Sequence, residues 1–399
     1  MKLRVACAGV VLAAVALLLC ACRWGPEARR ASREAPRPRL DLAGQSYARR
    51  VEDGHPLPRG PGAEGRPGDL LLENAFVCFL ISAPDRFVAG LPGGNLIDAA
   101  IQGGEDRMRL LVPLLGREPR TSPVYGAARV QHPGGPDLPA VVVVEGYLAV
   151  QPSVKVTTSY TLRPGSSSLE ITTTVRNEGQ GTLSRFACGD VLYHGRTLRY
   201  VPGCGSRPTG RTSSSTWMSF FWEDRAWGLL CGLGGSMEGL HRVGASELLY
   251  GTVDLPPGQS RAFRRRLVAV PGGPERVWEI AYPEPDHVLS HLAFQLTDRD
   301  SGEPLAGGEL IVQPADGRAP ALLVTDGAGR AELDLRAGSY AVTPWAVGRP
   351  PVQSLTVTCS AGTRHRLTIP LPPRAVARVK VRAKIGEFFS PTTARLSSY

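Results

Sequence analysis

Between residues 69 and 282 the sequence consists almost entirely of short apolar or alternating runs separated by Gly, Pro, Asn and Asp. Polar and apolar residues alternate most clearly over 154–162 and 169–175, on either side of the turn Arg163-Pro164-Gly165-Ser166. A period of two puts one set of side chains on each face of a strand, so these runs predict an antiparallel hairpin with one buried face. Helical periodicity is nearly absent. The density of strands therefore predicts an all-β fold, with a large two-sheet sandwich over residues 68–283.

Other strand runs support this interpretation. The hairpin, the following Asn177-Glu178-Gly179 and the phrase LPPGQS at 255–260 resemble the large two-sheet sandwiches of the galactose-mutarotase type. Members of that family use a His acid and a Glu base on a concave sheet, and no motif in this chain assigns such a pair. The other predicted strands are 70–81, 140–150, 217–222, 227–233, 246–253 and 261–270.

After a proline-marked junction, residues 286–372 carry a second and more compact set of strand signals. The phrases G-x-P-L-x-G at 302–307, T-D-G-x-G at 325–329 and L-x-x-G-x-Y at 335–340 place glycines where tight turns need them. These phrases resemble the carboxypeptidase regulatory-like, or transthyretin-like, seven-stranded sandwich, which implies a non-catalytic spacer or adhesion module. Residues 373–399 are predicted to be an incomplete further β module or an extra strand.

Residues 1–22 have the order of a secretory leader: Lys2 and Arg4, an apolar run over 5–19, then Leu19-Cys20-Ala21-Cys22. Leu three residues before a Cys, with a small residue directly before it, predicts a lipoprotein signal peptide with lipidation at Cys22. Cys20 fits worse because bulky Leu19 precedes it. A plain membrane anchor is the alternative, but the apolar run is short for a spanning helix.

This leader predicts a lipid-anchored protein of the bacterial cell envelope, attached to a membrane through its N-terminal lipid. Arg23, rather than Asp, follows the modified cysteine, which favours the outer membrane, on its periplasmic or surface side. Residues 23–67 are rich in Pro and Arg and lack apolar periodicity, so they are predicted to be a disordered tether.

The formal net charge is +10, and only four of the basic residues are lysines. The arginines are scattered, apart from Arg264-Arg265-Arg266 and a cluster near the leader, which is typical of a solvated face. We therefore predict no nucleic-acid partner.

Five cysteines follow the leader: Cys78, Cys188, Cys204, Cys231 and Cys359. An odd number leaves at least one free thiol in an oxidising compartment, while Cys188–Cys204 and Cys204–Cys231 bridges both remain allowed. No pair has the spacing of a zinc site, so we predict no metal and no cofactor.

The phrases GDLLLEN at 68–74, GGNLIDA at 93–99, GDV at 189–191, HG at 194–195 and VPGCG at 201–205 resemble lipoproteins of the CehA/McbA group. In that group a mutarotase-like and a regulatory-like sandwich precede a PHP-type metallohydrolase domain. PHP chemistry needs clustered His and Asp, typically beginning with H-x-H, and the seven histidines here include no H-x-H. The resemblance thus implies the accessory, non-catalytic region, with the catalytic domain missing from this chain.

Two groups of residues are candidates for ligand contacts. Asp190 with His194, and the acidic pair Glu223-Asp224, are dense enough to suggest polar chemistry, although the pair reads more simply as a turn. Trp217 and Trp222 belong to the densest aromatic stretch and could stack on sugar rings, although aromatic residues in strands are more often core.

We expect a membrane-anchored binding or scaffolding lipoprotein, directed at a glycan or a protein, with Asp190, His194, Trp217, Trp222 and Glu223 as its ligand contacts. No catalytic residue is assigned. The alternatives are the accessory portion of a secreted PHP-type hydrolase and, third, a mutarotase-like carbohydrate-active enzyme.

Overall fold

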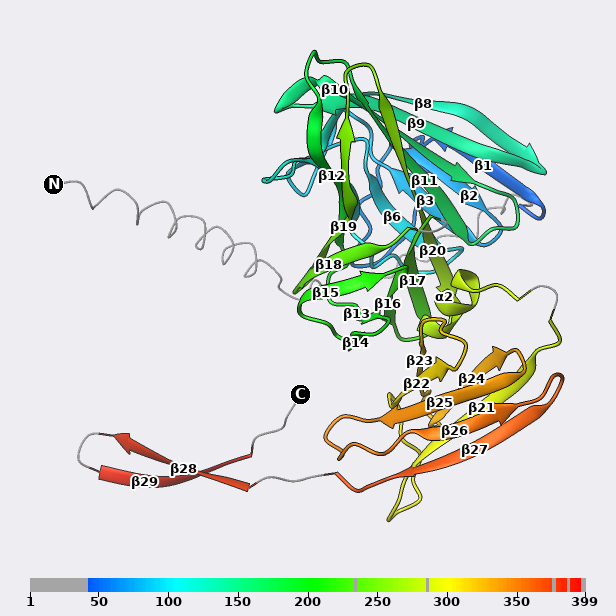
Figure 1. Ribbon diagram of the computed structural model, residues 1–399, viewed down its shortest axis with the longest axis vertical. Helices are drawn as coiled ribbons and strands as arrows, with labels where there is room; N and C mark the ends of the chain where they lie inside the picture. Colours follow the sequence, from blue (N-terminus) through cyan, green and yellow to red (C-terminus); the bar gives the residue numbers. More distant parts are fainter. Residues whose placement is uncertain (1–41, 233–234, 285–286, 375–377, 386–387, 396–399) are drawn as a thin grey trace. The chain divides into compact units, whose positions relative to one another are not determined.

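The computed structural model describes residues 42–232, 235–284, 287–374, 378–385 and 388–395. Within these residues the chain is built almost entirely of strands, with a single helix, α2 (Pro274–Ala281). A large sandwich is followed along the chain by a small one (Figure 1). This all-β arrangement confirms the predicted fold class.

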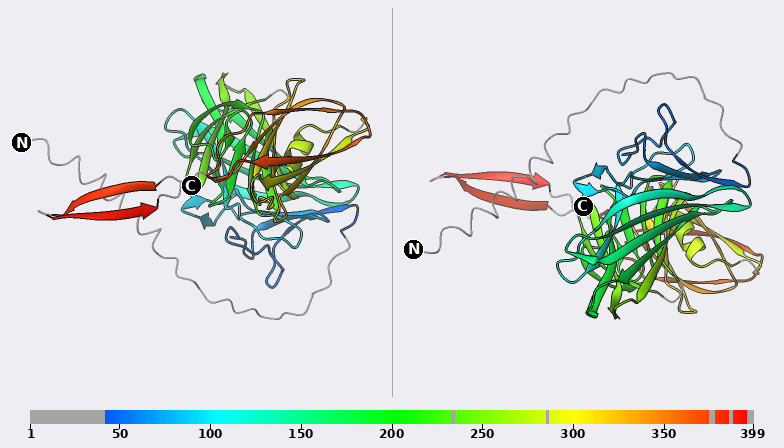
Figure 2. Two further views of the ribbon diagram at one scale, coloured as in Figure 1. Left: turned by 90° about the horizontal axis from the view of Figure 1, so that it is seen from below. Right: turned by 90° about the horizontal axis from the view of Figure 1, so that it is seen from above.

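The large sandwich is a continuous series of 18 paired strands (Figures 1 and 2). Apolar side chains from both halves of the series, such as Phe79 and Leu229, meet in one core. Burial of this apolar surface holds the two halves face to face. In order of pairing, the first half contains β14 (Gly205–Ser206), β13 (Leu198–Val201), β16 (Trp217–Trp222), β17 (Arg225–Cys231), β20 (Ser260–Pro271), β11 (Ser168–Asn177), β10 (Gln151–Leu162), β9 (Leu138–Leu148) and β8 (Pro123–Pro136).

The second half continues from β8 and completes the sandwich. A separate short hairpin, β4 (Phe87–Val88) and β5 (Leu91–Pro92), lies outside the series. In order of pairing, the second half contains β1 (Gln45–Arg50), β2 (Leu70–Asn74), β3 (Val77–Ile81), β6 (Leu96–Ile101), β7 (Leu110–Gly116), β12 (Leu183–Tyr193), β19 (Ala245–Leu255), β18 (Met237–Arg242) and β15 (Gly210–Ser215).

The hairpin predicted from strict alternation is present as β10 and β11. Val156 pairs with Val175, and Tyr160 pairs with Ile171. All four side chains are buried, as is Thr158 on the same face of β10, whereas Thr157 and Ser159 on the opposite face are half-buried. The period of two therefore decides which side chains enter the core.

Strand β1 corrects the predicted tether, which extended to residue 67. Residues 45–50 pair with β2 on one side and with β8 on the other, and Ala48 is buried. This short stretch carries two arginines and no apolar run, so its pattern did not indicate a strand. Residues 23–41 and the leader with Cys22 lie outside the described residues. In the part of the chain that is described, no helix has the length and apolar character needed to cross a membrane.

Helix α2 is also absent from the sequence prediction. Pro274 at its start and Glu275 in its first turn are favourable there, but eight residues are too few for a helical period to stand out. Val277 and Trp278 are buried against β16, β17 and β20. The helix thus covers one end of the first half of the large sandwich.

The small sandwich contains a three-stranded and a four-stranded sheet. In the first sheet β21 (Ser290–Asp298) lies between β24 (Arg330–Leu335) and β27 (Arg364–Leu371), and its pairing with β27 is parallel. The second sheet has the order β23 (Ala321–Val324), β22 (Glu309–Pro314), β25 (Gly338–Trp345) and β26 (Leu355–Cys359). In the region 373–399, β28 (Arg378–Ile385) and β29 (Phe388–Arg395) pair with each other.

Candidate functional site

Asp190, on β12, lies inside the large sandwich with none of its surface exposed. Its carboxylate accepts hydrogen bonds from Arg265 of β20, at 2.7 Å from Nε and 2.9 Å from Nη2, and another from the Tyr250 hydroxyl. Burial raises the pKa of Asp190, while the charge of Arg265 and the Tyr250 hydrogen bond oppose this rise. The ion pair joins the two halves of the sandwich from within, so Asp190 is a core residue rather than an exposed acid.

His194 follows β12 and is also buried, with 2% of its surface exposed. Its Nε2 lies 3.3 Å from Ser246 Oγ, which in turn lies 2.9 Å from His241 Nδ1. Burial lowers the pKa of His194 to about 3, with a further contribution from the charge of Arg199, and it lowers the pKa of His241 to about 4. A hydroxyl between two imidazoles can form a nucleophile and base pair. Here Ser246 is fully buried, so a substrate has no access to it.

The aromatic stretch forms core instead of a sugar-binding platform. Trp217 is 1% exposed and packs against Tyr200, with 5.6 Å between ring centroids. Trp222 is half-buried, and the guanidinium of Arg107 lies 4.5 Å from its ring centroid. The predicted stacking role of Trp217 is therefore corrected, because its ring faces other side chains rather than solvent.

Glu223 lies in the exposed two-residue turn between β16 and β17, as the turn interpretation expected. Its φ of 53° is in the left-handed region, which a tight turn requires. Across the described residues, no hydrogen bond or ring contact joins the five predicted ligand contacts to one another. Asp190, His194, Trp217, Trp222 and Glu223 belong to separate environments and do not form one site.

A pair of aspartates that the sequence did not single out, Asp98 on β6 and Asp106 in the loop before β7, is also buried. Asp98 accepts hydrogen bonds from the backbone amides of Glu64 and Gly65, at 2.7 and 2.8 Å, and Asp106 accepts them from Ala99 and Met108. Burial raises the pKa of Asp98 to about 6, and it also raises the pKa of Asp106, with a contribution from the charge of Asp98. Both carboxyls are fully buried and hold loop backbone, which assigns them a structural role.

The cysteines between residues 78 and 359 are present as thiols, so neither bridge that the sequence allowed is formed. Burial raises the pKa of Cys231 to about 12 and also raises the pKa of Cys78 and Cys188, which keeps these thiols protonated. Among the described residues, no group of three or more His, Cys, Asp or Glu side chains is placed to hold a metal ion.

A surface cleft of about 680 Å³ opens at one end of the small sandwich. Turns that are far apart in the sequence meet there: the β22–β23 turn, the β24–β25 turn, the β26–β27 turn and the segment before β21. Turns carried by a rigid scaffold are common places for binding residues. The cleft is lined by His287, Val288, Pro314, Ala315, Asp316, Arg336, Ala337, Gly338, Ser339, Tyr340 and Ala361.

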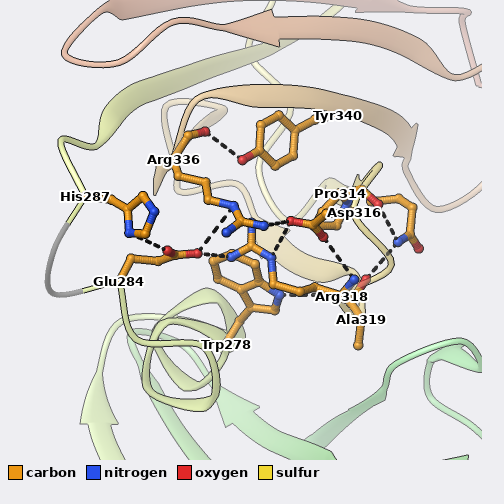
Figure 3. Close-up of polar contacts among 10 residues, drawn as sticks. Trp278, Glu284, His287, Pro314, Asp316, Arg318, Ala319, Arg336 and Tyr340 are labelled. Carbon is orange, nitrogen blue, oxygen red and sulfur yellow. Dashed lines mark hydrogen bonds and ion pairs between the residues drawn. The ribbon is translucent and has the colours of Figure 1, made fainter.

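Figure 3 shows a network of alternating charges, of which His287, Asp316 and Arg336 line one wall of the cleft. Asp316 accepts hydrogen bonds from Arg336 and, at 2.9 Å, from Arg318 Nε. Arg318 and Arg336 both contact the carboxylate of Glu284, which also lies 3.2 Å from His287 Nδ1. Each carboxylate thus bridges two guanidinium groups.

The network is anchored beneath the cleft by an aromatic ring. The guanidinium of Arg318 lies 5.2 Å from the ring centroid of Trp278, and Trp278 Nε1 donates to the carbonyl of Ala319 at 2.8 Å. Arg318 is 14% exposed at its side chain, whereas Arg336 is 33% exposed. Arg336 and its partner Asp316 are therefore the charged groups of the network that a ligand can reach.

Electrostatics keep this wall ionised. Partial burial of the Asp316 carboxyl favours its neutral form, but hydrogen bonds from the Arg318 amide and from Arg336 outweigh this effect and lower its pKa. The hydrogen bond to Asp316 raises the pKa of Arg336. A cleft lined by fixed charges of both signs suits a polar ligand with donors and acceptors.

Sequence reasoning missed this cleft for a physical reason. Glu284, Asp316 and Arg336 each stand near a turn, and isolated charges near turns are the usual solvated pattern. Only the pairing of β21 with β24 and of β22 with β25 brings them together.

No family model and no curated protein matches the chain. Similar solved structures include a GH36 α-galactosidase of Geobacillus stearothermophilus, at 12% identity and a TM-score of 0.37 over 52% of this chain and 41% of that one. A TPR-domain protein of Parabacteroides distasonis has 10% identity and a TM-score of 0.39, over 51% of this chain and 47% of its own. This chain therefore spans less than half the length of either protein. A galactose mutarotase-like protein of Lactobacillus casei has 9% identity and a TM-score of 0.34, with 51% of this chain and 100% of that one covered.

Proposed function

We propose that this chain is a lipid-anchored binding protein of the bacterial cell envelope, and that it binds a polar ligand in the charged cleft of its small sandwich. The cleft itself carries this proposal. It is open to solvent, it is built from turns on a rigid scaffold, and Asp316 and Arg336 present opposite charges within it. By contrast, Asp190, His194 and Ser246 are buried, which gives the mutarotase-like enzyme alternative little support.

The proposed anchor rests on the leader. Leu19 and Ala21 precede Cys22 in the pattern that lipoprotein signal peptidase reads. The resemblance to the accessory region of CehA/McbA-type lipoproteins stays a prediction, and Asp190 and His194, which belong to it, are core residues. Radiolabelled palmitate should label the protein in cells and should fail to label Cys22→Ser. Cys20→Ser is the matched control and should keep the label, and equal labelling of both variants would argue against this anchor.

Binding in the cleft can be tested with a defined panel of probes. The panel contains short peptides of mixed charge, neutral oligosaccharides and acidic oligosaccharides, and titration calorimetry on the full-length protein measures their affinities. Arg336→Ala removes an exposed guanidinium, and Ser339→Trp fills the cleft without changing its charge. For any probe that binds in the cleft, we expect both variants to weaken binding on the order of tenfold.

Arg330→Ala is the control for these variants, because Arg330 is an exposed arginine on β24 of the same sandwich and does not line the cleft. It should leave the affinity unchanged. The proposed binding site is wrong if no probe of the panel binds, or if Ser339→Trp leaves the affinity of every bound probe unaltered.

A further inference from the structure

The three consecutive arginines Arg264, Arg265 and Arg266 lie on β20, where successive side chains point to opposite faces of the sheet. Arg265 points into the core, where it pairs with Asp190. Arg264 and Arg266 point the opposite way, and Arg264 is exposed while Arg266 is half-buried. Arg264 and Arg266 therefore stand on the outer face of the sheet, with their Cα atoms about 7 Å apart along the strand.

Rows of hydroxyl groups lie beside these two arginines. Thr172 of β11 pairs with Arg264, and on its other side Thr172 pairs with Ser159 of β10. Thr174 pairs with Thr157 in the same way. We call this surface the hydroxyl–arginine face. It consists of Lys155, Thr157, Ser159 and Thr161 on β10, Glu170, Thr172, Thr174 and Arg176 on β11, and Arg264 and Arg266 on β20.

The balance of charge on this face is positive. Lys155, Arg176, Arg264 and Arg266 are basic, and Glu170 is acidic. Two more carboxylates border the face: Glu145 of β9, which pairs with Thr157 and forms an ion pair with Arg129, and Glu178, which lies 3.8 Å from Arg176 Nε. Glu170 already pairs with Arg163, at 3.2 Å from Nε. Among the described residues, neither Arg264 nor Arg266 forms an ion pair. Glu170 lies opposite Arg266 across the strands, but its carboxylate is paired with Arg163, so both guanidinium groups can bind an external anion.

We propose that the hydroxyl–arginine face binds an acidic polysaccharide. Arginine matches the planar geometry of a carboxylate with two parallel hydrogen bonds, which a uronate unit would supply. The threonine and serine hydroxyls both donate and accept, as sugar hydroxyls do. Tyr147, which is 38% exposed, pairs with Lys155 and places an aromatic ring at the rim of the face.

Charge and hydroxyls together favour a glycan over a lipid surface. The outer positions that make up the face carry no large aliphatic side chain, and Val141 and Val143, which continue its rows on β9, are half-buried and buried. Little apolar area is therefore present to enter a bilayer. This surface lies on strands of the large sandwich and shares no residue with the cleft of the small one. The inference thus stands or fails separately from the proposed function.

The test uses the full-length protein and immobilised polygalacturonate, with dextran as the neutral glycan. We expect binding to polygalacturonate that weakens as salt is raised, and no binding to dextran. Arg264→Ser/Arg266→Ser should weaken the binding on the order of tenfold. Arg364→Ser/Arg366→Ser is the matched control, because it also removes two arginines spaced by two on one strand, β27, where both are exposed. It should bind as the wild type does.

A second double variant distinguishes binding of a glycan from binding of other anions. Thr172→Val/Thr174→Val keeps shape and strand propensity but removes two hydroxyls, and it should weaken binding to polygalacturonate. Circular dichroism verifies that each variant is folded. Failure of polygalacturonate to bind, an equal loss in the Arg364/Arg366 control, or binding only to phosphatidylglycerol vesicles would each overturn the proposal.

Discussion

Arg264 and Arg265 are adjacent in the sequence but point to opposite faces of the sheet, so Arg264 is exposed and Arg265 is buried. Because Arg265 is buried against Asp190, removing the carboxylate should leave an uncompensated charge in the core. We expect Asp190→Ala to lower the free energy of unfolding by about 3–5 kcal/mol. Urea titration measures this quantity, and Arg264→Met, at an exposed position, should change it by less than about 0.5 kcal/mol.

The double variant Asp190→Leu/Arg265→Met distinguishes two causes of the lost stability: the unpaired charge of Arg265 and the lost polar contacts of the ion pair. It removes both charges, so its unfolding free energy should exceed that of Asp190→Ala, because no charge is left unpaired. A double variant less stable than Asp190→Ala would show that the polar contacts of the pair, and not the stranded charge, dominate.

The buried histidines predict a stability that depends on pH. His194 and His241 have pKa values lowered from 6.5 to about 3 and about 4, chiefly by burial. Well above pH 6.5, from about pH 7.5, both imidazoles are neutral in the folded and the unfolded chain. As the pH falls below 6.5, the unfolded chain binds protons that the folded chain excludes, so stability falls toward pH 4, at up to about 1.4 kcal/mol per pH unit for each histidine.

His194→Gln/His241→Gln provides the reference for this effect, since it lacks both titrating groups. The free energy of unfolding of wild type minus variant should be constant above about pH 7.5 and should decrease as the pH is lowered from 6.5 to about 4.5. Other buried acids contribute equally to both proteins and cancel in the difference. Parallel curves over that range would contradict the prediction.

At the level of elements, strict alternation of polar and apolar residues predicted the long strands, whereas short elements were missed. The β10–β11 hairpin followed from its pattern, because nine consecutive residue pairs repeat the period of two. β1 and α2 were missed, since six or eight residues carry too few apolar positions to define a period. The alternation pattern also could not predict that Asp190 and His194 are buried, because the partners of these two side chains, Arg265 and Ser246, lie on other strands.

Contact between α2 and the sheet depends on a residue without a side chain. A Cβ added to Gly228 on β17 would lie 2.2 Å from Val277 Cγ1, so the helix would have to move. We expect Gly228→Ala to lower the free energy of unfolding by about 1–3 kcal/mol. Thermal or urea unfolding measures the change.

Two further variants test whether the close approach of α2 is the cause. Gly126→Ala on β8 introduces the same methyl group where no atom lies within 4 Å, and it should be nearly neutral. Gly228→Ala/Val277→Ala makes room for the methyl group and should recover part of the loss. If Gly126→Ala is as destabilising as Gly228→Ala, backbone effects of glycine replacement explain the result instead.

On the scale of the whole molecule, the two sandwiches share a core. Tyr200, Trp217 and Val268 of the large sandwich belong to the same apolar cluster as Leu310 and Leu322 of the small one, with α2 between them. Hydrogen bonds cross the same junction, from the Tyr200 hydroxyl to the carbonyl of Pro320 at 2.9 Å and from Ser206 Oγ to Glu309 at 2.6 Å. No pattern in the sequence indicated this continuity, because each module alone accounts for its own strand signals.

A shared core predicts that both sandwiches unfold together. Trp278 is the side chain on which the coupling depends most, because its ring is 2% exposed, lies under Arg318 and donates to the carbonyl of Ala319. We expect the wild-type protein to unfold in one cooperative calorimetric transition and Trp278→Ala, which removes about 3–5 kcal/mol of packing, to unfold in two.

Trp345→Ala is the matched control, since Trp345 is 37% exposed and lies on β25 of the small sandwich. It should lower the transition temperature slightly and keep a single transition. Trp278→Phe retains a ring but not the hydrogen bond to Ala319, and it should fall between the wild type and Trp278→Ala. Two transitions in the wild type, or one in Trp278→Ala, would mean that the sandwiches are independent folding units that merely touch.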